Sequence, residues 1–381
     1  MTIPAVTLSV SGLRIRARYA LAGPPAETPE RAAAIAVEQT IEFPADLIAD
    51  DDIRRHVMGR VESIEEIEPE LSVAELSYAV ETTGFELPQL LNVLFGNCSL
   101  LPGVRLLDVR LPPEVLARFR GPRFGVAGLR TLLDAQTRPL LATALKPMGM
   151  DSAALASMAG TLASGGIDLI KDDHSLANQP FAVFADRVAK CAEAVRAAAA
   201  RTGRPALYLP SVNAPADELE ARVQFARDAG AGGLLVLPGL AGFDAMRHIA
   251  ENDALALPVM AHPAFLGSFV TGERGGIEHG LLFGTLMRLA GADMTIFPSY
   301  GGRFTFSRDA CRSIAAACRS PLGHLSPSLP VPAGGMTLGR LAELTSFYGR
   351  DSVLLIGGDL QRGDLYDNAR RMRDAAERMA G

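Results

Sequence analysis

The most regular feature of the chain is a repeated pairing of a short apolar run with an amphipathic stretch, which begins near residue 140. The apolar runs are nearly continuous, as expected for parallel strands that are buried on both faces. The stretches between them carry apolar residues three and four positions apart and often close with glycine, which is typical of helices. Eight such runs occur, at residues 140–147, 167–173, 206–213, 232–239, 257–263, 292–299, 329–335 and 352–359.

Eight strand–helix units predict a (β/α)8 TIM barrel. A doubly wound open sheet uses the same unit, but eight regular repeats whose strands end in polar residues favour closure. The earlier part of the chain predicts an α+β domain of ferredoxin-like type with a mixed sheet. We expect this domain in residues 1–128 and the barrel in residues 129–381. The expected N-terminal strands lie near 5–20, 37–44, 56–67, 74–81 and 103–110, and the expected helices near 28–36 and 86–95.

Composition excludes several classes of protein. The net charge of −6 is spread along the chain, and no Lys/Arg-rich run offers the basic face that nucleic-acid binding requires. No segment is long and apolar enough for a membrane span, and the alternating first residues do not resemble a signal peptide. The four cysteines show no metal-binding spacing, which predicts reduced, buried thiols in a cytoplasmic protein. They are Cys98, Cys191, Cys311 and Cys318.

Lysine is rare in this chain and falls at strand ends. Of the 37 basic residues only Lys146, Lys171 and Lys190 are lysine, and the first two close predicted strands. Arginine stays protonated, whereas lysine can lose its proton and act as a base or nucleophile. The placement therefore indicates amine chemistry at the barrel rim.

The carboxyl ends of the predicted strands are polar or glycine-rich, and in TIM barrels these ends form the active site. The residues 171–174, Lys-Asp-Asp-His, combine oxygen and nitrogen donors suitable for a metal ion. Glycine pairs close the seventh and eighth strands and can offer backbone N–H groups to a phosphate. A metal ion beside a phosphate site and two lysines suggests proton abstraction next to a carbonyl.

Several motifs resemble the RuBisCO large-chain family. GGIDLIKDDHSLANQPFAVFADRV is similar to the family signature, with His174 in place of glutamate. LLATALKPMGM resembles the motif of the first barrel strand, and LPVMAHPAF, LPVPAGGMTLG and DSVLLIGGDLQRGD match later strand ends in order and spacing. AVEQTIEFP matches more weakly in the N-terminal part. The resemblance covers most of the chain.

This resemblance implies roles for individual residues. Lys146 would act in enolisation, and Lys171 would be carbamylated by CO2 to become an anionic metal ligand beside Asp173 and His174. His262 would stand with Lys146 and Lys171 among the catalytic residues. Glu38 and Asn97 would reach the barrel of a partner subunit, which implies a homodimer with shared active sites, although Asn92 could take the place of Asn97. The substrate and its phosphate would be bound by Glu38, Asn97, Ser299, Gly334, Gly335, Gly357 and Gly358.

Departures from the family pattern argue against carboxylation. Pro263 replaces an arginine, and Phe297-Pro298 replaces a histidine, so one of two phosphate sites is lost. The loop SYGGRFTFS after the sixth strand carries no lysine, and Met148 replaces the second lysine of the first motif. This pattern resembles the RuBisCO-like proteins. Arg303 in that loop could bind a substrate carboxylate or phosphate, or could lie on the surface.

The resemblance implies a metal-dependent lyase or isomerase that forms an enolate from a small phosphorylated keto sugar or keto acid. We favour decarboxylation of a 3-oxo sugar-acid phosphate, because the His174 motif departs from the salvage enolase pattern. The alternatives are a 2,3-diketo-5-methylthiopentyl-1-phosphate enolase or related isomerase, and a non-catalytic regulator or scaffold. The expected cofactor is Mg2+, with Mn2+ or another borderline metal considered because imidazole would replace a carboxylate at residue 174.

Overall fold

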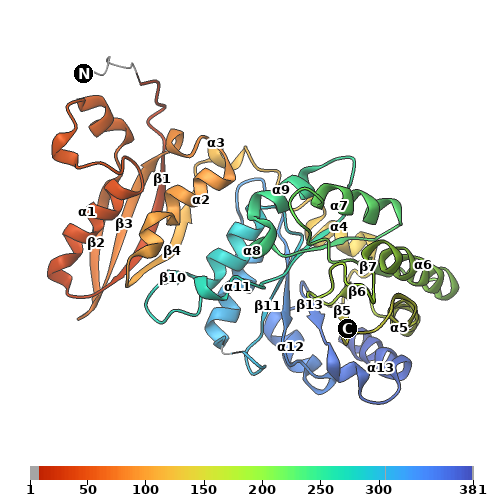
Figure 1. Cartoon of the computed structure of the whole chain (residues 1–381). Helices are drawn as coiled ribbons and strands as arrows, with labels where there is room; N and C mark the ends of the chain where they lie inside the picture. The colour runs from red at the N-terminus through yellow and green to blue at the C-terminus, as the bar shows by residue number, and fades with distance from the viewer. Residues whose placement is uncertain (1–7, 305, 380–381) are drawn as a thin grey trace. The chain divides into compact units, whose positions relative to one another are not determined.

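The computed structural model describes residues 8–304 and 306–379. The chain divides into two compact units (Figure 1), of which the first comprises residues 1–119 and 266–282 and the second comprises residues 120–265 and 283–381. The sequence-based boundary at 128/129 therefore falls inside the second unit. The segment 266–282 leaves the run of barrel repeats and belongs to the first unit, which its apolar pattern did not indicate.

The first unit is a five-stranded mixed sheet with helices. Its strands are β1 (Arg14–Ala22), β2 (Arg60–Glu68), β3 (Leu71–Ala79), β4 (Val104–Arg110) and β10 (Gly276–Ile277), and its longer helices are α1 (Thr28–Glu38) and α2 (Leu87–Phe95). The sheet order is β10-β4-β1-β3-β2, in which β10 runs parallel to β4 and the other pairs are antiparallel. Without β10 this is the ferredoxin-like arrangement, so the predicted class of this unit is confirmed.

One predicted strand of this unit was wrong. The segment 37–44 continues α1 and then turns, with the N–H of Gln39 donating to the carbonyl of Ile35 at 3.0 Å. The preceding alanine-rich run places Ala32, Ile35 and Ala36 on one buried helical face, and this face outweighs the short apolar pattern that suggested a strand. The first expected strand begins at Arg14, and its predicted residues 5–7 lie outside the described part of the chain.

The second unit is a (β/α)8 barrel, as predicted. Its strands are β5 (Leu140–Leu145), β6 (Leu169–Asp172), β7 (Leu207–Leu209), β8 (Leu234–Val236), β9 (Val259–Ala261), β11 (Met294–Pro298), β12 (Leu329–Ala333) and β13 (Val353–Leu355). All paired strands are parallel, in the orders β13-β5-β6-β7 and β8-β9-β11-β12. A bridge from Ser211 to Leu235 joins β7 to β8, and β12 lies beside β13.

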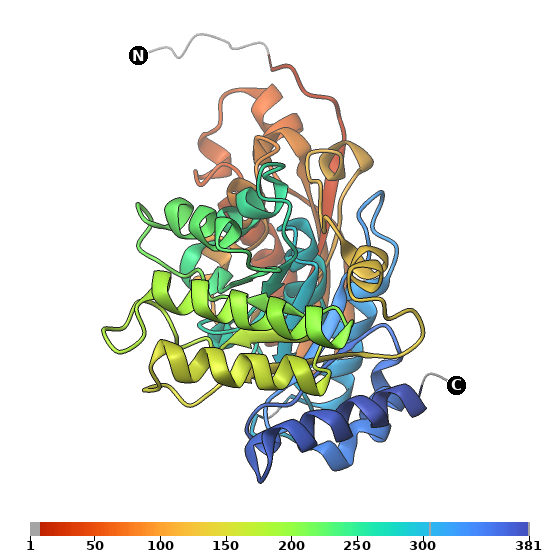
Figure 2. The ribbon, with the colours of Figure 1, turned by 90° about the vertical axis from the view of Figure 1, so that its right-hand side faces the viewer.

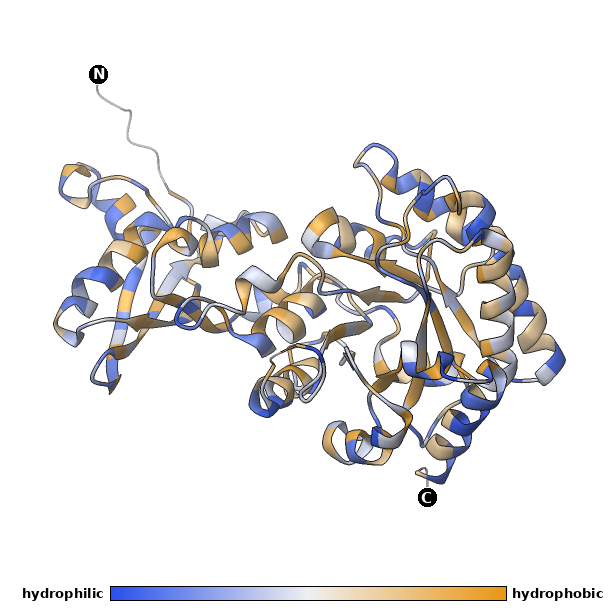
Figure 3. Cartoon of the chain, turned by 60° about the horizontal axis from the view of Figure 1, so that its bottom comes forward, coloured by the Kyte–Doolittle hydropathy of each residue, from blue (hydrophilic) through white to orange (hydrophobic). Residues whose placement is uncertain are grey.

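The barrel strands are largely hydrophobic (Figure 3), and their inward side chains form a packed apolar core. Alternate residues of the strands point inward, as Leu140 and Ala142 of β5 do. Other strands contribute Leu169, Met260 and Leu355 in the same way. This alternation decides which residue at each strand end faces the barrel axis.

Helices surround the barrel strands. They are α4 (Gly125–Leu132), α5 (Ser152–Gly165), α6 (Phe184–Thr202), α7 (Leu219–Asp228), α8 (Pro238–Ala241), α9 (Phe243–Glu251), α10 (Met287–Leu289), α11 (Arg308–Arg319), α12 (Leu341–Tyr348) and α13 (Leu365–Arg378), and the short α3 (Pro113–Leu116) belongs to the first unit. Figure 2 shows α5 and α6 side by side over the strands.

Two expectations from composition concern the cysteines and membrane-spanning segments. All four cysteines are free and buried, as predicted. Within the described residues, every helix is too short or too polar to cross a membrane.

Candidate active site

Strand alternation brings four of the predicted site residues to the inner rim of the barrel. Lys146 follows Ala142 by four positions, and Lys171 and Asp173 follow the core residue Leu169 by two and four positions. His262 follows the core residue Met260 by two. Because residues two apart on a strand share a face, these polar side chains continue the apolar columns of the core.

Asp173 is the centre of this group. Its Oδ2 accepts a hydrogen bond from Lys146 Nζ at 2.9 Å, and its Oδ1 lies 2.9 Å from both the backbone N and the ring Nδ1 of His174. Burial alone would raise the pKa of Asp173, but the hydrogen bonds from His174 and Lys146 outweigh it and hold the pKa well below its usual range. Asp173 is therefore a carboxylate at neutral pH.

Lys171 is a buried amine. Only 3% of the residue is exposed, and Nζ donates to the backbone carbonyl of Asp172 at 2.9 Å. Burial lowers the pKa of Lys171 to about 8, although the nearby Asp173 carboxylate opposes this change. A substantial neutral fraction is therefore present just above physiological pH, and a neutral amine is the reactive form of lysine. By contrast, 34% of the Lys146 side chain is exposed.

Asp172 points away from the rim and anchors the strand that carries Lys171 and Asp173. It is fully buried and accepts hydrogen bonds from Arg187 Nε at 3.1 Å, Tyr208 Oη at 2.7 Å and the N–H of Ser211 at 3.0 Å. Burial raises the pKa of Asp172, and the Arg187 charge opposes this shift. Sequence reasoning did not identify Arg187 or Tyr208, although the arginine is part of the matched motif.

His262 stacks on His174 at the rim. The ring centroids are 4.5 Å apart and the planes differ by 11°. Burial and the positive charge of Lys171 lower the pKa of His262 well below its usual range, so this imidazole is neutral. Its Nδ1 lies 3.1 Å from the N–H of Ala264 and accepts that hydrogen bond, which places the ring proton on Nε2.

The predicted glycine positions lie at the ends of β12 and β13. A side-chain atom added at Gly357 would lie 3.9 Å from Lys146 Cε, so this glycine borders the lysine. Gly334 and Gly335 have φ of +88° and +89°, which glycine adopts without strain. The N–H of Leu338, in the loop after β12, donates to Asp359 beyond β13 at 2.9 Å and joins the two turns.

Ser299 does not join this group. It lies an odd number of positions beyond the inward residues Met294 and Ile296 of β11, so its side chain faces the surrounding helices. Its hydroxyl lies 2.8 Å from Tyr348 Oη and is buried. Strand alternation therefore directs the Ser299 hydroxyl toward Tyr348 of α12, and its role in substrate binding stays a prediction.

Glu38 and Asn97 lie together on the first unit. Asn97 Nδ2 donates to Glu38 Oε1 at 2.8 Å, and both side chains are accessible to solvent. Asn92, the alternative from the sequence, instead places its side-chain amide 3.3 Å from Gln89. The pairing thus favours Asn97 over Asn92 as the partner of Glu38.

The donor set at the rim fits a metal ion only if Lys171 is modified. Within the described residues, no three His, Cys, Asp or Glu side chains gather closely enough to hold an ion. Asp173 and His174 supply one carboxylate and one imidazole, and the Nδ1 of His174 is already engaged by Asp173. A carbamate on the neutral Lys171 amine would add the third, anionic donor.

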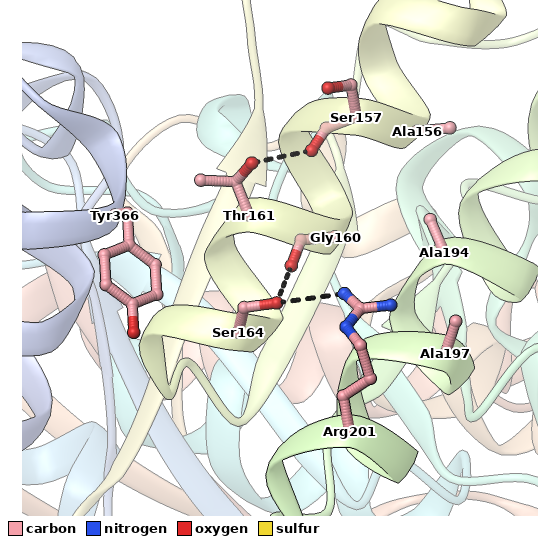
Figure 4. A pocket seen from close by; sticks show the side chains of 9 residues that line it. All are labelled: Ala156, Ser157, Gly160, Thr161, Ser164, Ala194, Ala197, Arg201 and Tyr366. Atoms are coloured by element: carbon pink, nitrogen blue, oxygen red, sulfur yellow. Dashed lines mark hydrogen bonds between the residues drawn. The ribbon is translucent and has the colours of Figure 1, made fainter.

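A hollow of about 520 Å3 lies on the outside of the barrel (Figure 4). It is lined by residues of α5, α6 and α13, including Gly160, Ala194 and Tyr366, and none of its residues comes from a strand end. The hydroxyls of Thr161 and Ser164 donate to carbonyls of their own helix at 3.0 and 2.7 Å. The hollow therefore lacks the chemical groups found at the rim.

The fold and rim define a TIM-barrel protein with a ferredoxin-like domain and a lysine–aspartate–histidine site. Residues 125–369 match the family model for the catalytic domain of the ribulose bisphosphate carboxylase large chain. This protein belongs to the RuBisCO large-chain family, as a RuBisCO-like protein.

Named relatives and a solved structure agree with this membership. The chain is 41% identical over 348 residues to the 5-methylthioribulose-1-phosphate isomerase of Rhodospirillum rubrum, with 91% of each chain covered. It is 33% identical over 346 residues to the 2,3-diketo-5-methylthiopentyl-1-phosphate enolase of Geobacillus kaustophilus, covering 87% of this chain and 84% of the other. The crystal structure of a Rubisco-like protein from Rhodopseudomonas palustris has a TM-score of 0.87 and 43% identity, covering 96% and 97% of the two chains.

Proposed function

We propose that this protein is an isomerase that moves a proton between carbons of a small phosphorylated ketose through an enediolate, with 5-methylthioribulose 1-phosphate as the first substrate to test. The observation that carries the proposal is the grouping of Lys146, Lys171, Asp173 and His262 on one inner rim. The 41% identity to a protein named as such an isomerase supports the choice of substrate.

The residues of the rim have complementary roles in this proposal. Lys146 is partly exposed and takes the proton from the carbon beside the carbonyl, while Asp173 holds its amine in place at 2.9 Å. His262 is neutral and carries its proton on Nε2, so it donates a hydrogen bond to a substrate oxygen without adding charge. The glycine turns at Gly335 and Gly357 bind the phosphate through backbone N–H groups.

A divalent cation, with Mg2+ as the first choice, would be held by carbamylated Lys171, Asp173 and His174. Such an ion, when bound, stabilises the negative oxygen of an enediolate. The amine of Lys171 adds to the carbon of CO2 and releases a proton, which forms the carbamate. Its lowered pKa favours this addition because only the neutral amine has a free electron pair.

The relatives' names favour isomerisation over the decarboxylation that we expected from the sequence. Both reactions pass through the same kind of enolate, so His174 alone does not separate them. The enolase reaction of 2,3-diketo-5-methylthiopentyl 1-phosphate is the second candidate, supported by the 33% identity to an enolase of that name.

A substrate panel tests the proposal. The purified protein, with Mg2+ and bicarbonate in D2O, is incubated separately with 5-methylthioribulose 1-phosphate, the diketo phosphate, ribulose 1,5-bisphosphate and a 3-oxo sugar-acid phosphate. We expect 1H NMR to show an isomeric ketose phosphate and deuterium incorporation with the first compound alone. Release of CO2 from the oxo acid without isomerisation would instead support the decarboxylase.

We further propose a homodimer whose active sites combine the barrel of one subunit with Glu38 and Asn97 of the other. Light scattering gives the oligomeric state directly. Two inactive variants, Lys146→Met and Asn97→Ala, are then mixed after reversible dissociation. Shared sites predict recovery of about a quarter of the wild-type activity, because half of the random dimers contain one intact site. No recovery from a mixture of confirmed dimers would show that each subunit is complete by itself.

A further inference from the structure

The loop that follows β11 lies directly on the turn that follows β12. The N–H of Arg303 donates to the carbonyl of Gly334 at 3.1 Å. A side-chain atom at Gly335 would lie 3.4 Å from Arg303 Cγ, and one at Gly334 would lie 3.1 Å from the Phe304 ring. The side chains of Arg303 and Phe304 therefore cover the two glycines that the sequence assigned to phosphate binding.

This loop is held in place from its other side. Tyr300 donates to Glu343 at 2.8 Å, and its ring lies under the guanidinium groups of Arg308, at 4.4 Å, and Arg340, at 5.2 Å. Gly302 packs so closely on the β12 turn that any side chain there would collide with the Gly334 carbonyl. The contacts fix the backbone that carries Arg303, so the start of its side chain has a defined position.

The guanidinium of Arg303 has no carboxylate partner in the described part of the chain. The guanidinium carbon lies over the Phe304 ring, 5.4 Å from its centroid, and Arg303 is exposed. The arginines behind the loop differ in this respect, because Arg340 pairs with Glu343 at 2.9 Å and Arg308 lies 3.9 Å from the same residue. Arg303 is thus the arginine of this loop region that is available to an anion.

We infer that Arg303 is a substrate-binding residue that sets specificity for a phosphate monoester by joining the Gly334–Gly335 turn in holding the phosphate. The inference deepens the proposed function and rests on it for the identity of the substrate. A guanidinium presents two parallel N–H donors to a tetrahedral dianion, and the adjacent turn exposes backbone to the same oxygens. The Arg303 guanidinium lies over the Phe304 ring, with its central carbon 5.4 Å from the ring centroid, and this cation–π contact helps to hold it beside the turn.

A phosphate titration tests this role without requiring turnover. Inorganic phosphate is titrated into the full-length protein and followed by 31P NMR, for wild type, Arg303→Gln, Arg303→Lys and the control Arg362→Gln. Arg362 lies just beyond β13, is 84% exposed in its side chain and has Asp359 at 3.6 Å, so the control removes the same charge from a neighbouring loop. We expect Arg303→Gln to raise the phosphate Kd about tenfold or more. Arg303→Lys should cause a smaller loss, and the control should change Kd by less than about twofold.

The titration distinguishes phosphate binding by Arg303 from other roles of this residue. An unchanged phosphate Kd in Arg303→Gln, equal losses in Arg303→Gln and Arg362→Gln, or no phosphate binding by wild type would each overturn the inference. A purely structural role for Arg303 predicts a lower unfolding temperature with the phosphate Kd unchanged. Displacement of phosphate by equimolar acetate would contradict selectivity for phosphate. If phosphate binding depends on Arg303 but no ketose phosphate is isomerised, the proposed function fails while the phosphate role stands.

Discussion

Replacing Arg187 by methionine should destabilise the barrel strongly, although the residue contacts no predicted substrate. Its side chain is fully buried and is paired with the equally buried Asp172. Two of its other donors bind the carbonyls of Ala182 at 2.6 Å and Ala177 at 2.7 Å. Methionine fills much of the volume but satisfies none of these three acceptors.

The magnitude follows from the charge that remains. Breaking a buried ion pair from one side costs about 3–5 kcal/mol, because the other charge stays buried and unpaired. The carboxylate of Asp172 keeps its hydrogen bonds from Tyr208 and Ser211, which limits the loss. The carbonyls of Ala182 and Ala177 lose their donors, which increases the loss of stability. Each unsatisfied carbonyl costs about 1–3 kcal/mol. We therefore expect a loss near the upper end of the range.

Denaturant unfolding at several pH values measures this effect. Burial already raises the pKa of Asp172 above its unfolded value, and removal of Arg187 raises it further. A group whose pKa is higher in the folded state favours folding when protonated, so the deficit should be smallest in acid and should grow as the pH rises. Arg196→Met on the same helix is the matched control, because its side chain is 61% exposed and its surface ion pair should contribute less than about 1 kcal/mol.

Two results would refute this reasoning. A loss equal to that of the Arg196 control would show that the buried pair does not support the strand. A stability deficit of Arg187→Met that grows in acid would show that Asp172 is not the charge left unpaired by the substitution. The double variant with Asp172→Asn should be more stable than additivity predicts, because the amide removes the unpaired charge.

Three further predictions concern the rim. Lys146→Met should keep the fold and lower kcat by about a hundredfold or more, and a near-normal kcat would remove Lys146 from proton transfer. Lys171→Met, in CO2-free buffer, should raise the free energy of unfolding near pH 7 by about 3 kcal/mol, because burial lowers the pKa of Lys171 from 10.5 to about 8. Between these two values the unfolded state binds more protons than the folded state, so wild-type stability should rise from pH 8 to 10.5. The stability advantage of Lys171→Met over wild type should therefore shrink, and an advantage that stays constant would contradict the burial argument. His174→Glu should tighten Mg2+ binding measured by titration calorimetry, and equal affinities would show that His174 is not a ligand.

The arrangement of the barrel could be predicted from the sequence because its information is local. Continuous apolar runs separated by helical stretches specify parallel strands buried on both faces, and each predicted run contains an observed strand. The position of Lys146, Lys171, Asp173 and His262 follows from the same pattern, because the residue two beyond an inward apolar position also faces inward. Applied to Ser299, this rule would have placed its side chain on the outer face.

Other features depend on contacts between residues far apart in the chain. The short segment that forms β10 has too little pattern of its own and becomes a strand by pairing with β4. The conformation of residues 37–44 depends on the preceding helix α1, which continues into them. The pairing of Asn97 with Glu38 depends on how α1 lies against the chain after α2.

The properties of the rim residues also divide into those that the sequence determines and those that depend on tertiary contacts. The sequence by itself determined which side chains stand at the strand ends, since strand length and alternation fix their direction. It did not determine that Lys171 has a lowered pKa or that Arg303 lies over Gly335, because burial and close approach arise only when separate strands and loops pack together. The tertiary structure alone decides these properties, because they depend on the surroundings of each group rather than on its neighbours in sequence.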